Sequence, residues 1–173
     1  MQLTQRSLAL KPSSTLAVTA RVGALKAQGV DVIGFGAGQP DFDTPDHIKQ
    51  AAIDALKAGM TKYQPTPGAP EARAAIAKKL KTENNIDCAP EHIVITAGAK
   101  HAMFETIQAL VEPRREVIIL TPAWVSYRPM VEIAGGSVVE VPASIDNDFK
   151  ITPNQLEAAI TDRTAAVIFN TPS

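Results

Sequence analysis

The stretch Ile93-Val94-Ile95-Thr96-Ala97-Gly98-Ala99-Lys100-His101-Ala102-Met103 decides the fold of this chain. Its three β-branched residues at 93–95 predict a short buried strand, and an apolar helical pattern begins at 102. A strand that turns through small residues straight into a helix leaves the first N–H groups of that helix without intrahelical acceptors, at the positive end of the helix dipole. The pattern therefore fits two interpretations, a phosphate-binding turn and an ordinary strand–helix junction.

The chain on the C-terminal side of this stretch alternates between predicted strands and helices. We expect further strands at 116–121, 137–141 and 165–169, and helices at 100–111, at 125–134 and from Pro153. The strands are apolar runs instead of strictly alternating patterns, which indicates a mostly parallel sheet covered by helices on both faces. The expected fold class is thus a three-layer α/β/α domain. Ligands of such sheets bind at the carboxyl ends of the strands, which here are 97–100, 122–124 and 170–172.

The N-terminal part of the chain contains predicted helices and one unusual loop. Helices are expected at 15–28, from Thr44-Pro45 to Gly59 with Thr44 as the N-cap, and from Pro70 to Asn84-Asn85, and residues 31–35 suggest a short strand. The loop 34–45 has alternating glycines, but Gln39 stands where a dinucleotide-binding fingerprint requires its third glycine. A Rossmann phosphate loop is therefore rejected. A backbone that passes close to a ligand and a tight structural turn both remain open.

Composition and charge exclude several classes of protein. The chain has 173 residues, of which 45% are apolar and 20% charged, and this composition predicts one globular core. The formal net charge is −1 with scattered Lys and Arg, so we expect no nucleic-acid partner and no membrane partner. No run approaches the ~18 apolar residues of a membrane span, and we expect a cytoplasmic protein. Cys88 is single and the histidines are dispersed, so no metal site is expected.

Five motifs occur in an order that resembles one known family. They are 36–45 (Gly-Ala-Gly-Gln-Pro-Asp-Phe-Asp-Thr-Pro), 61–63 (Thr-Lys-Tyr), 96–100 (Thr-Ala-Gly-Ala-Lys), 122–127 (Pro-Ala-Trp-Val-Ser-Tyr) and 170–172 (Asn-Thr-Pro). In content and spacing they are similar to the class I pyridoxal-phosphate-dependent aminotransferases, most closely the bacterial aspartate/prephenate aminotransferase subgroup. The similarity covers essentially all 173 residues.

The resemblance implies a cofactor site for pyridoxal 5'-phosphate. Gly98, Ala99 and Lys100 match the cradle of the cofactor's phosphate, and Trp124 matches the aromatic residue that stacks on the pyridine ring. Judged without the resemblance, a single Trp is more often a core residue. Tyr63 matches a tyrosine that reaches the phosphate of the neighbouring subunit, which implies a homodimer.

The resemblance also implies a substrate site for an amino acid and a 2-oxo acid. Gly38 matches the glycine whose backbone meets the substrate α-carboxylate, and Trp124 also borders this site. Lys100 with Thr15 matches the pair that binds the distal carboxylate of a dicarboxylic substrate. Without the resemblance, Lys100 is interpreted as a solvated charge at the start of a helix. The expected reaction is transamination of aspartate, glutamate or arogenate. A lyase or decarboxylase on the same scaffold, or a non-catalytic phosphate-binding homologue, is the alternative.

The resemblance places several functional groups of the family outside this sequence. The lysine that forms the Schiff base belongs to the later half of the family and would lie beyond residue 173, so no catalytic residue is assigned here. We therefore expect this stretch to be an N-terminal portion that is inactive by itself. Residues 1–45 are expected to contribute to the small domain and the substrate loop, and 46–173 to form part of the large cofactor-binding domain.

Overall fold

The computed structural model describes residues 2–36 and 38–171, which form two compact units. The first unit comprises Met1–Ala37 with Lys100–Ser173, and the second comprises Gly38–Ala99. The predicted division into 1–45 and 46–173 concerns domains of a longer family member and stays a prediction.

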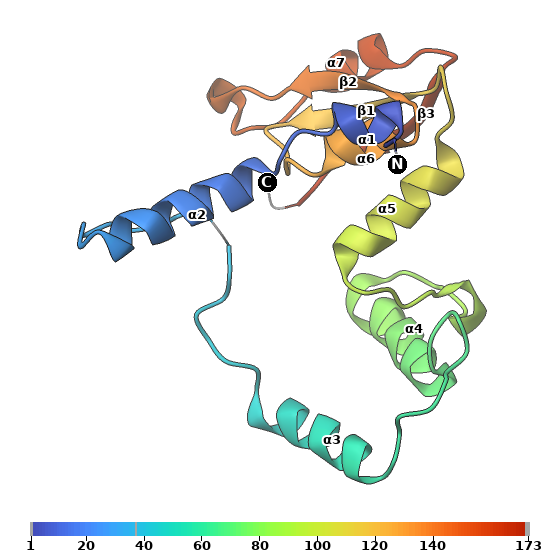
Figure 1. The fold of residues 1–173 in the computed structure, drawn as a ribbon. Helices are drawn as coiled ribbons and strands as arrows, with labels where there is room; N and C mark the ends of the chain where they lie inside the picture. The colour runs from blue at the N-terminus through green and yellow to red at the C-terminus, as the bar shows by residue number, and fades with distance from the viewer. Residues whose placement is uncertain (1, 37, 172–173) are drawn as a thin grey trace. The chain divides into compact units, whose positions relative to one another are not determined.

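The first unit is built on a parallel β-sheet (Figure 1). In the described residues it has three strands, β1 (Glu116–Thr121), β2 (Ser137–Pro142) and β3 (Thr164–Ile168), in the order β2-β1-β3. Residue Ile118 in the central strand is level with Val139 on one side and Val167 on the other. The predicted α/β class with a parallel sheet is confirmed, and each of the three predicted strand ranges agrees with the structure within one residue at either end.

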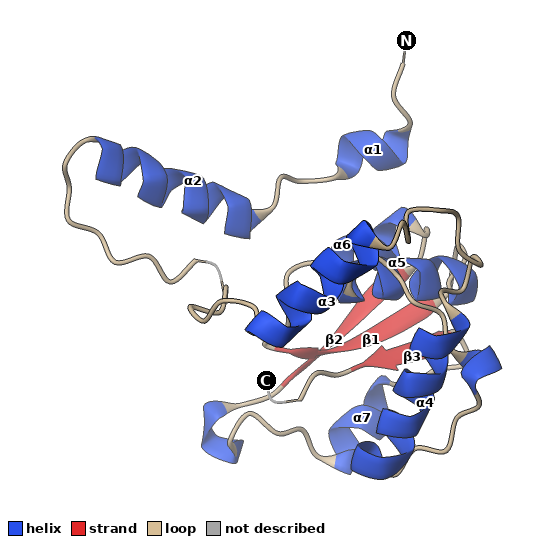
Figure 2. Ribbon diagram, turned by 90° about the horizontal axis from the view of Figure 1, so that it is seen from below, coloured by secondary structure: helices blue, strands red, loops and turns tan. Residues whose placement is uncertain are grey.

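Helices cover both faces of this sheet. The α-helices of the first unit are α1 (Gln5–Ala9), α2 (Ser14–Ala27), α5 (Ala99–Leu110, whose first residue alone belongs to the second unit), α6 (Tyr127–Ile133) and α7 (Pro153–Ala159). Helices α6 and α7 lie on opposite faces, as Figures 1 and 2 show from two directions. The start of α7 is fixed by a capping box, in which the Thr152 hydroxyl accepts from the Gln155 N–H and the Gln155 side chain accepts from the Thr152 N–H.

The buried core of the first unit lies between the sheet and helices α5 and α6. Residues Val117 and Ile119 of β1 point into it, whereas Ile118 between them faces the opposite side, as the period of two requires. Helix α5 contributes Ile107, which is 3% exposed. The core cluster is Ile107, Val111, Val117, Ile119, Met130, Val131 and Ile168. This packing holds α5, whose first turn carries Lys100, against the sheet.

The second unit consists of α3 (Asp46–Lys57), α4 (Pro70–Asn84) and the 3₁₀ turn η1 (Pro90–His92). Helix α4 ends where Asn85 adopts a left-handed conformation with φ of 55°, as the Asn-Asn pair predicted. The prediction of Thr44 as the N-cap of α3 is wrong, because Pro45 occupies the cap position without a side-chain hydrogen bond.

Asp43 connects the loop before α3 to the helix through Lys49, without capping the helix. The Asp43 carboxylate accepts the Thr44 N–H at 2.8 Å and pairs with Lys49 Nζ at 2.8 Å, and Lys49 also pairs with Asp46. Donation from Lys49, and then from the Thr44 N–H, lowers the pKa of Asp43. A lysine one turn into the helix thus ties the preceding loop to α3.

Two predicted strands are not strands in the described structure. Residues 93–96 form no ladder with any other described segment, and 31–35 likewise lack a sheet partner. The Ile95 N–H donates instead to the Pro67 carbonyl oxygen at 2.9 Å. Only Ile93 of the β-branched run is buried, whereas Val94 is exposed. The residues have strand propensity, but a strand exists only where a neighbour pairs with it.

A charged network closes the N-terminal end of β1. The Glu116 carboxylate accepts from the Thr161 hydroxyl at 2.7 Å and from Arg163 Nε at 2.8 Å, with a further bond from Arg163 Nη2. The Thr161 hydroxyl and the Arg163 guanidinium lower the pKa of Glu116 below its ordinary 4.5. This network joins the central strand to the segment that leads into β3.

Removing the charge of Glu116 should lower stability in a pH-dependent way. Because the folded pKa lies below the unfolded one, the carboxylate stabilises the fold above about pH 4.5, and this contribution is lost as the pH falls through the folded pKa. We expect Glu116→Gln to lower the urea midpoint at about pH 7, with the difference from wild type shrinking as the pH falls below the ordinary pKa of 4.5. Glu157→Gln, at an exposed position of α7, is the control. A pH-independent loss would contradict the charge-based account.

No helix in the described part of the chain is both long enough and apolar enough to cross a membrane.

Candidate functional site

The turn before α5 is tight and places a glycine in the left-handed region. Gly98 has a φ of +85°, a conformation that side-chain-bearing residues rarely adopt, and a Cβ built there would meet no heavy atom within 4 Å. Within the turn the Gly98 N–H donates to the Thr96 carbonyl oxygen at 2.8 Å, and the Thr96 hydroxyl donates to the Gly98 carbonyl oxygen at 3.0 Å. Ala99 is the first residue of α5. A tight turn with open space at its glycine therefore directly precedes a twelve-residue helix.

Lys100 and Trp124 lie together in the first unit. The Lys100 ammonium is 4.9 Å from the centroid of the Trp124 ring, which is cation–π distance. Trp124 follows β1, and its indole is oriented by Tyr127, whose ring lies edge-on at 5.4 Å with an interplanar angle of 89°. The Trp124 side chain is 41% exposed, so it is not a core residue.

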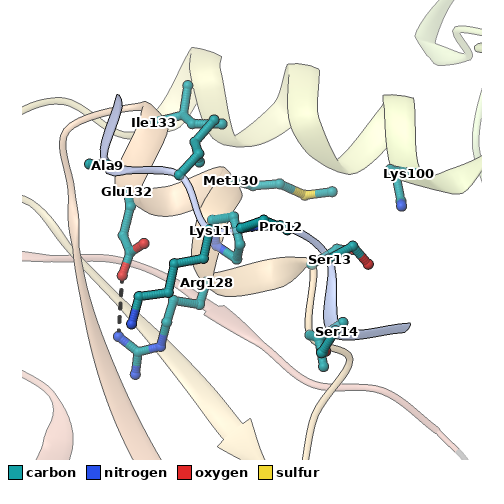
Figure 3. Close-up of a pocket in the computed structure, with 14 residues that line it drawn as sticks. Ala9, Lys11, Pro12, Ser13, Ser14, Lys100, Arg128, Met130, Glu132 and Ile133 are labelled. Carbon is teal, nitrogen blue, oxygen red and sulfur yellow. Dashed lines mark hydrogen bonds and ion pairs between the residues drawn. The ribbon is translucent and has the colours of Figure 1, made fainter. Parts of the chain in front are cut away.

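A pocket of about 560 Å³ adjoins Lys100 (Figure 3). Its lining comes from the segment 9–14, from Lys100 and from the residues that begin and form α6. Ser14, which precedes Thr15 at the start of α2, is among the lining residues, while Thr15 itself is not. The volume is within the range of small-molecule sites.

The other predicted site residues are distributed over both units. Gly38, Tyr63, Gly98 and Ala99 belong to the second unit, and Thr15 lies in the first turn of α2 in the first unit. The Tyr63 side chain is fully exposed, and a Cβ built at Gly38 would meet no neighbouring atom within 4 Å. Of the predicted residues, the structure shows contact between Lys100 and Trp124. The motif residues Ala37 and Pro172 lie outside the described residues.

The sequence did not point to Arg128 and Met130, both of which line the pocket beside Lys100. Arg128 pairs with Glu140 of β2 at 2.6 Å and with Glu132 of its own helix at 3.5 Å. The Glu140 carboxylate raises the pKa of Arg128 above its already high ordinary value. The i,i+4 spacing of Arg128 and Glu132 could have predicted their ion pair. The pairing of Arg128 with Glu140 could not be predicted in this way, because it depends on how β2 is placed in the sheet.

Comparison with known proteins identifies the family. Residues 30–173 match the family model of aminotransferase class I and II, and the chain belongs to this family. It is 49% identical over 173 residues to an aspartate aminotransferase of Bacillus subtilis, and 47% identical over 171 residues to the aspartate/prephenate aminotransferase of Thermus thermophilus. The alignments cover 100% and 99% of this chain, and 44% of each relative. The chain thus spans less than half the length of these curated relatives.

Solved structures give the same fold. The aspartate aminotransferase of Thermus thermophilus with maleate superposes with a TM-score of 0.97 at 47% identity, over 100% of this chain and 45% of that one. An aspartate aminotransferase of Rhizobium meliloti gives a TM-score of 0.94 at 42% identity, over 100% of this chain and 43% of that one. The predicted resemblance to class I aminotransferases is confirmed.

Proposed function

We propose that this chain forms part of a pyridoxal-phosphate-dependent enzyme that transfers an amino group between a dicarboxylic amino acid and a 2-oxo acid. The observation that carries the proposal is the contact between Lys100 and Trp124. It places a cation that would bind a substrate carboxylate beside a flat ring that would stack on the cofactor. The sequence is similar to aspartate and aspartate/prephenate aminotransferases.

The residues present fit a phosphorylated pyridine cofactor. Gly98 would leave room for the phosphate to approach the turn, the backbone N–H groups of Ala99 and Lys100 at the start of α5 would hold it, and Trp124 would stack on the ring. The exposed Tyr63 would serve the phosphate of a neighbouring subunit in a homodimer. When bound, pyridoxal phosphate supplies an electron sink for the carbanion that amino-group transfer requires.

The substrate would be oriented at both of its ends by this chain. Gly38 would meet the α-carboxylate through its backbone, while Lys100 with Thr15 would bind the distal carboxylate. The aspartate aminotransferase of Thermus thermophilus was solved with maleate, a dicarboxylate, and this supports the assignment of a dicarboxylic substrate. None of the ten lysines matches the family's Schiff-base position, so the reaction would depend on residues supplied by the rest of the relatives' length. Residues 1–45 would contribute to the small domain and 46–173 to the large domain.

The direct test is a transamination assay on a protein that carries this chain together with the segments matching the rest of its relatives. We expect aspartate and 2-oxoglutarate to give oxaloacetate and glutamate with added pyridoxal phosphate. Carbon dioxide release from aspartate would indicate a decarboxylase on the same scaffold. Cofactor binding with no turnover of any amino acid would indicate a non-catalytic homologue.

The proposed phosphate cradle predicts a specific effect of adding a side chain at Gly98. Gly98→Ala strains a backbone at φ +85°, at a cost of about 1–2 kcal/mol, and turning the backbone away would misdirect the N–H groups. We expect the affinity for pyridoxal phosphate to fall about tenfold, with the affinity for pyridoxal, which lacks the phosphate, nearly unchanged. Both are measured by absorbance titration.

Gly29→Ala is the matched control for this change. Gly29 has a φ of +79° and equally open surroundings, but it ends α2 and has no assigned ligand. Both variants should lose similar stability, and only Gly98→Ala should lose phosphate-dependent affinity. Equal losses of affinity in the two variants would contradict the cradle.

A further inference from the structure

The Lys100 ammonium lies on an aromatic ring and has no carboxylate partner in the described structure. The ammonium is 4.9 Å from the centroid of the Trp124 ring, and no carboxylate of residues 2–36 or 38–171 lies within the 4.0 Å limit of an ion pair. Lys100 also lies in the first turn of α5, where the helix dipole disfavours a cation. The contact thus leaves the charge of Lys100 available to a stronger, anionic partner.

The Trp124 indole is supported by a neighbouring ring, whereas Lys100 carries its ammonium on a flexible side chain. The Tyr127 ring supports Trp124 edge-on, and the Tyr127 N–H donates to the Trp124 carbonyl oxygen at 3.2 Å. Lysine carries its ammonium on a flexible four-carbon stem, and a partly exposed cation–π contact contributes only about 0.5–1 kcal/mol. A hydrogen-bonded carboxylate is worth about 1.5–3 kcal/mol. An arriving carboxylate can therefore draw the ammonium off the ring.

We infer that Trp124 is a resting position for the Lys100 ammonium, and that binding of a distal carboxylate exchanges this cation–π contact for an ion pair. The inference rests on the proposed function, since it concerns the substrate end that Lys100 would read. It adds a specificity role for Trp124: the ring competes for the lysine, so a ligand that lacks the second carboxylate leaves Lys100 on the indole. The preference for a dicarboxylate then equals the difference in free energy between the ion pair of Lys100 and its cation–π contact.

The sequence supplies its own reporter, because Trp124 is the single tryptophan of the chain. We would titrate the cofactor-free 173-residue chain with succinate, a dicarboxylate, and follow tryptophan emission while calorimetry measures binding independently. Butyrate at equal ionic strength serves as the monocarboxylate probe. The variants are Lys100→Met, which removes the ammonium and keeps the stem, and Lys150→Met as the control. Lys150 pairs with Asp148 at 3.6 Å, lies in the same unit and is exposed.

The inference expects three results together. Succinate changes the emission of the wild type and of Lys150→Met in a saturable way, and butyrate does not. Ligand-free Lys100→Met already has emission shifted in the direction of the succinate-saturated wild type. Succinate binds Lys100→Met at least about tenfold more weakly and changes its emission little.

Other results would overturn the exchange, and calorimetry separates its failure from that of the proposed function. Succinate binding without an emission change would leave the dicarboxylate site standing and refute the exchange. Emission of ligand-free Lys100→Met equal to that of the wild type would show that the ammonium does not rest on the ring. Absence of succinate binding would remove both the exchange and the proposed substrate class.

Discussion

Replacing Ile107 by alanine should lower the free energy of unfolding by about 2–5 kcal/mol. Ile107 is 3% exposed and packs from α5 into the cluster that includes Val117 and Val131. Alanine is the better helix former, so the loss cannot come from helix propensity and must come from burial and from the cavity left behind. Because whole domains are stable by only about 5–15 kcal/mol, this single change would remove a large fraction of the total.

Leu110→Ala is the matched control, since Leu110 is also an aliphatic residue of α5 but is 56% exposed. Urea unfolding followed by far-ultraviolet circular dichroism measures both variants, and Leu110→Ala should stay within about 1 kcal/mol of the wild type. Equal destabilisation of the two variants would mean that α5 is not held through its Ile107 face. The attachment of the helix that carries Lys100 would then need another explanation.

The sheet was predictable because its signals are local and mutually consistent. The apolar runs that became β1, β2 and β3 are bounded by polar or turn residues, and a helix separates each from the next, so a parallel arrangement follows from elementary topology. The same reasoning failed at 93–96, whose β-branched residues are as strand-like as those of β1. Their state depends on whether another segment pairs with them, and that information is not in the run itself.

The candidate site was predictable in its residues but not in its contacts. Gly98 could be singled out because a glycine lets the backbone approach an anion closely, whereas its φ of +85° is seen only in the structure. The exposure of Trp124 went against what composition favours, since a lone tryptophan is usually core. The placement of Lys100 on the indole joins a helix start to a loop 24 residues further along the chain, and no periodicity encodes such a pair.

Lys100→Ala should reduce kcat/KM for aspartate by about 10- to 150-fold in an active protein that carries this chain, because the proposed charge-assisted hydrogen bond to the distal carboxylate, worth about 1.5–3 kcal/mol, would be lost. With alanine as the substrate, which lacks the distal carboxylate, the variant should keep a kcat/KM within about twofold of the wild type. The proposed role of the Lys100 ammonium does not involve this substrate. The ratio of the two kcat/KM values is therefore the decisive quantity, and it is insensitive to how much active enzyme each preparation contains. Lys150→Ala should leave this ratio unchanged. Equal losses for aspartate and alanine would instead assign Lys100 to the cofactor's phosphate alone and return the choice of substrate to other residues of the site.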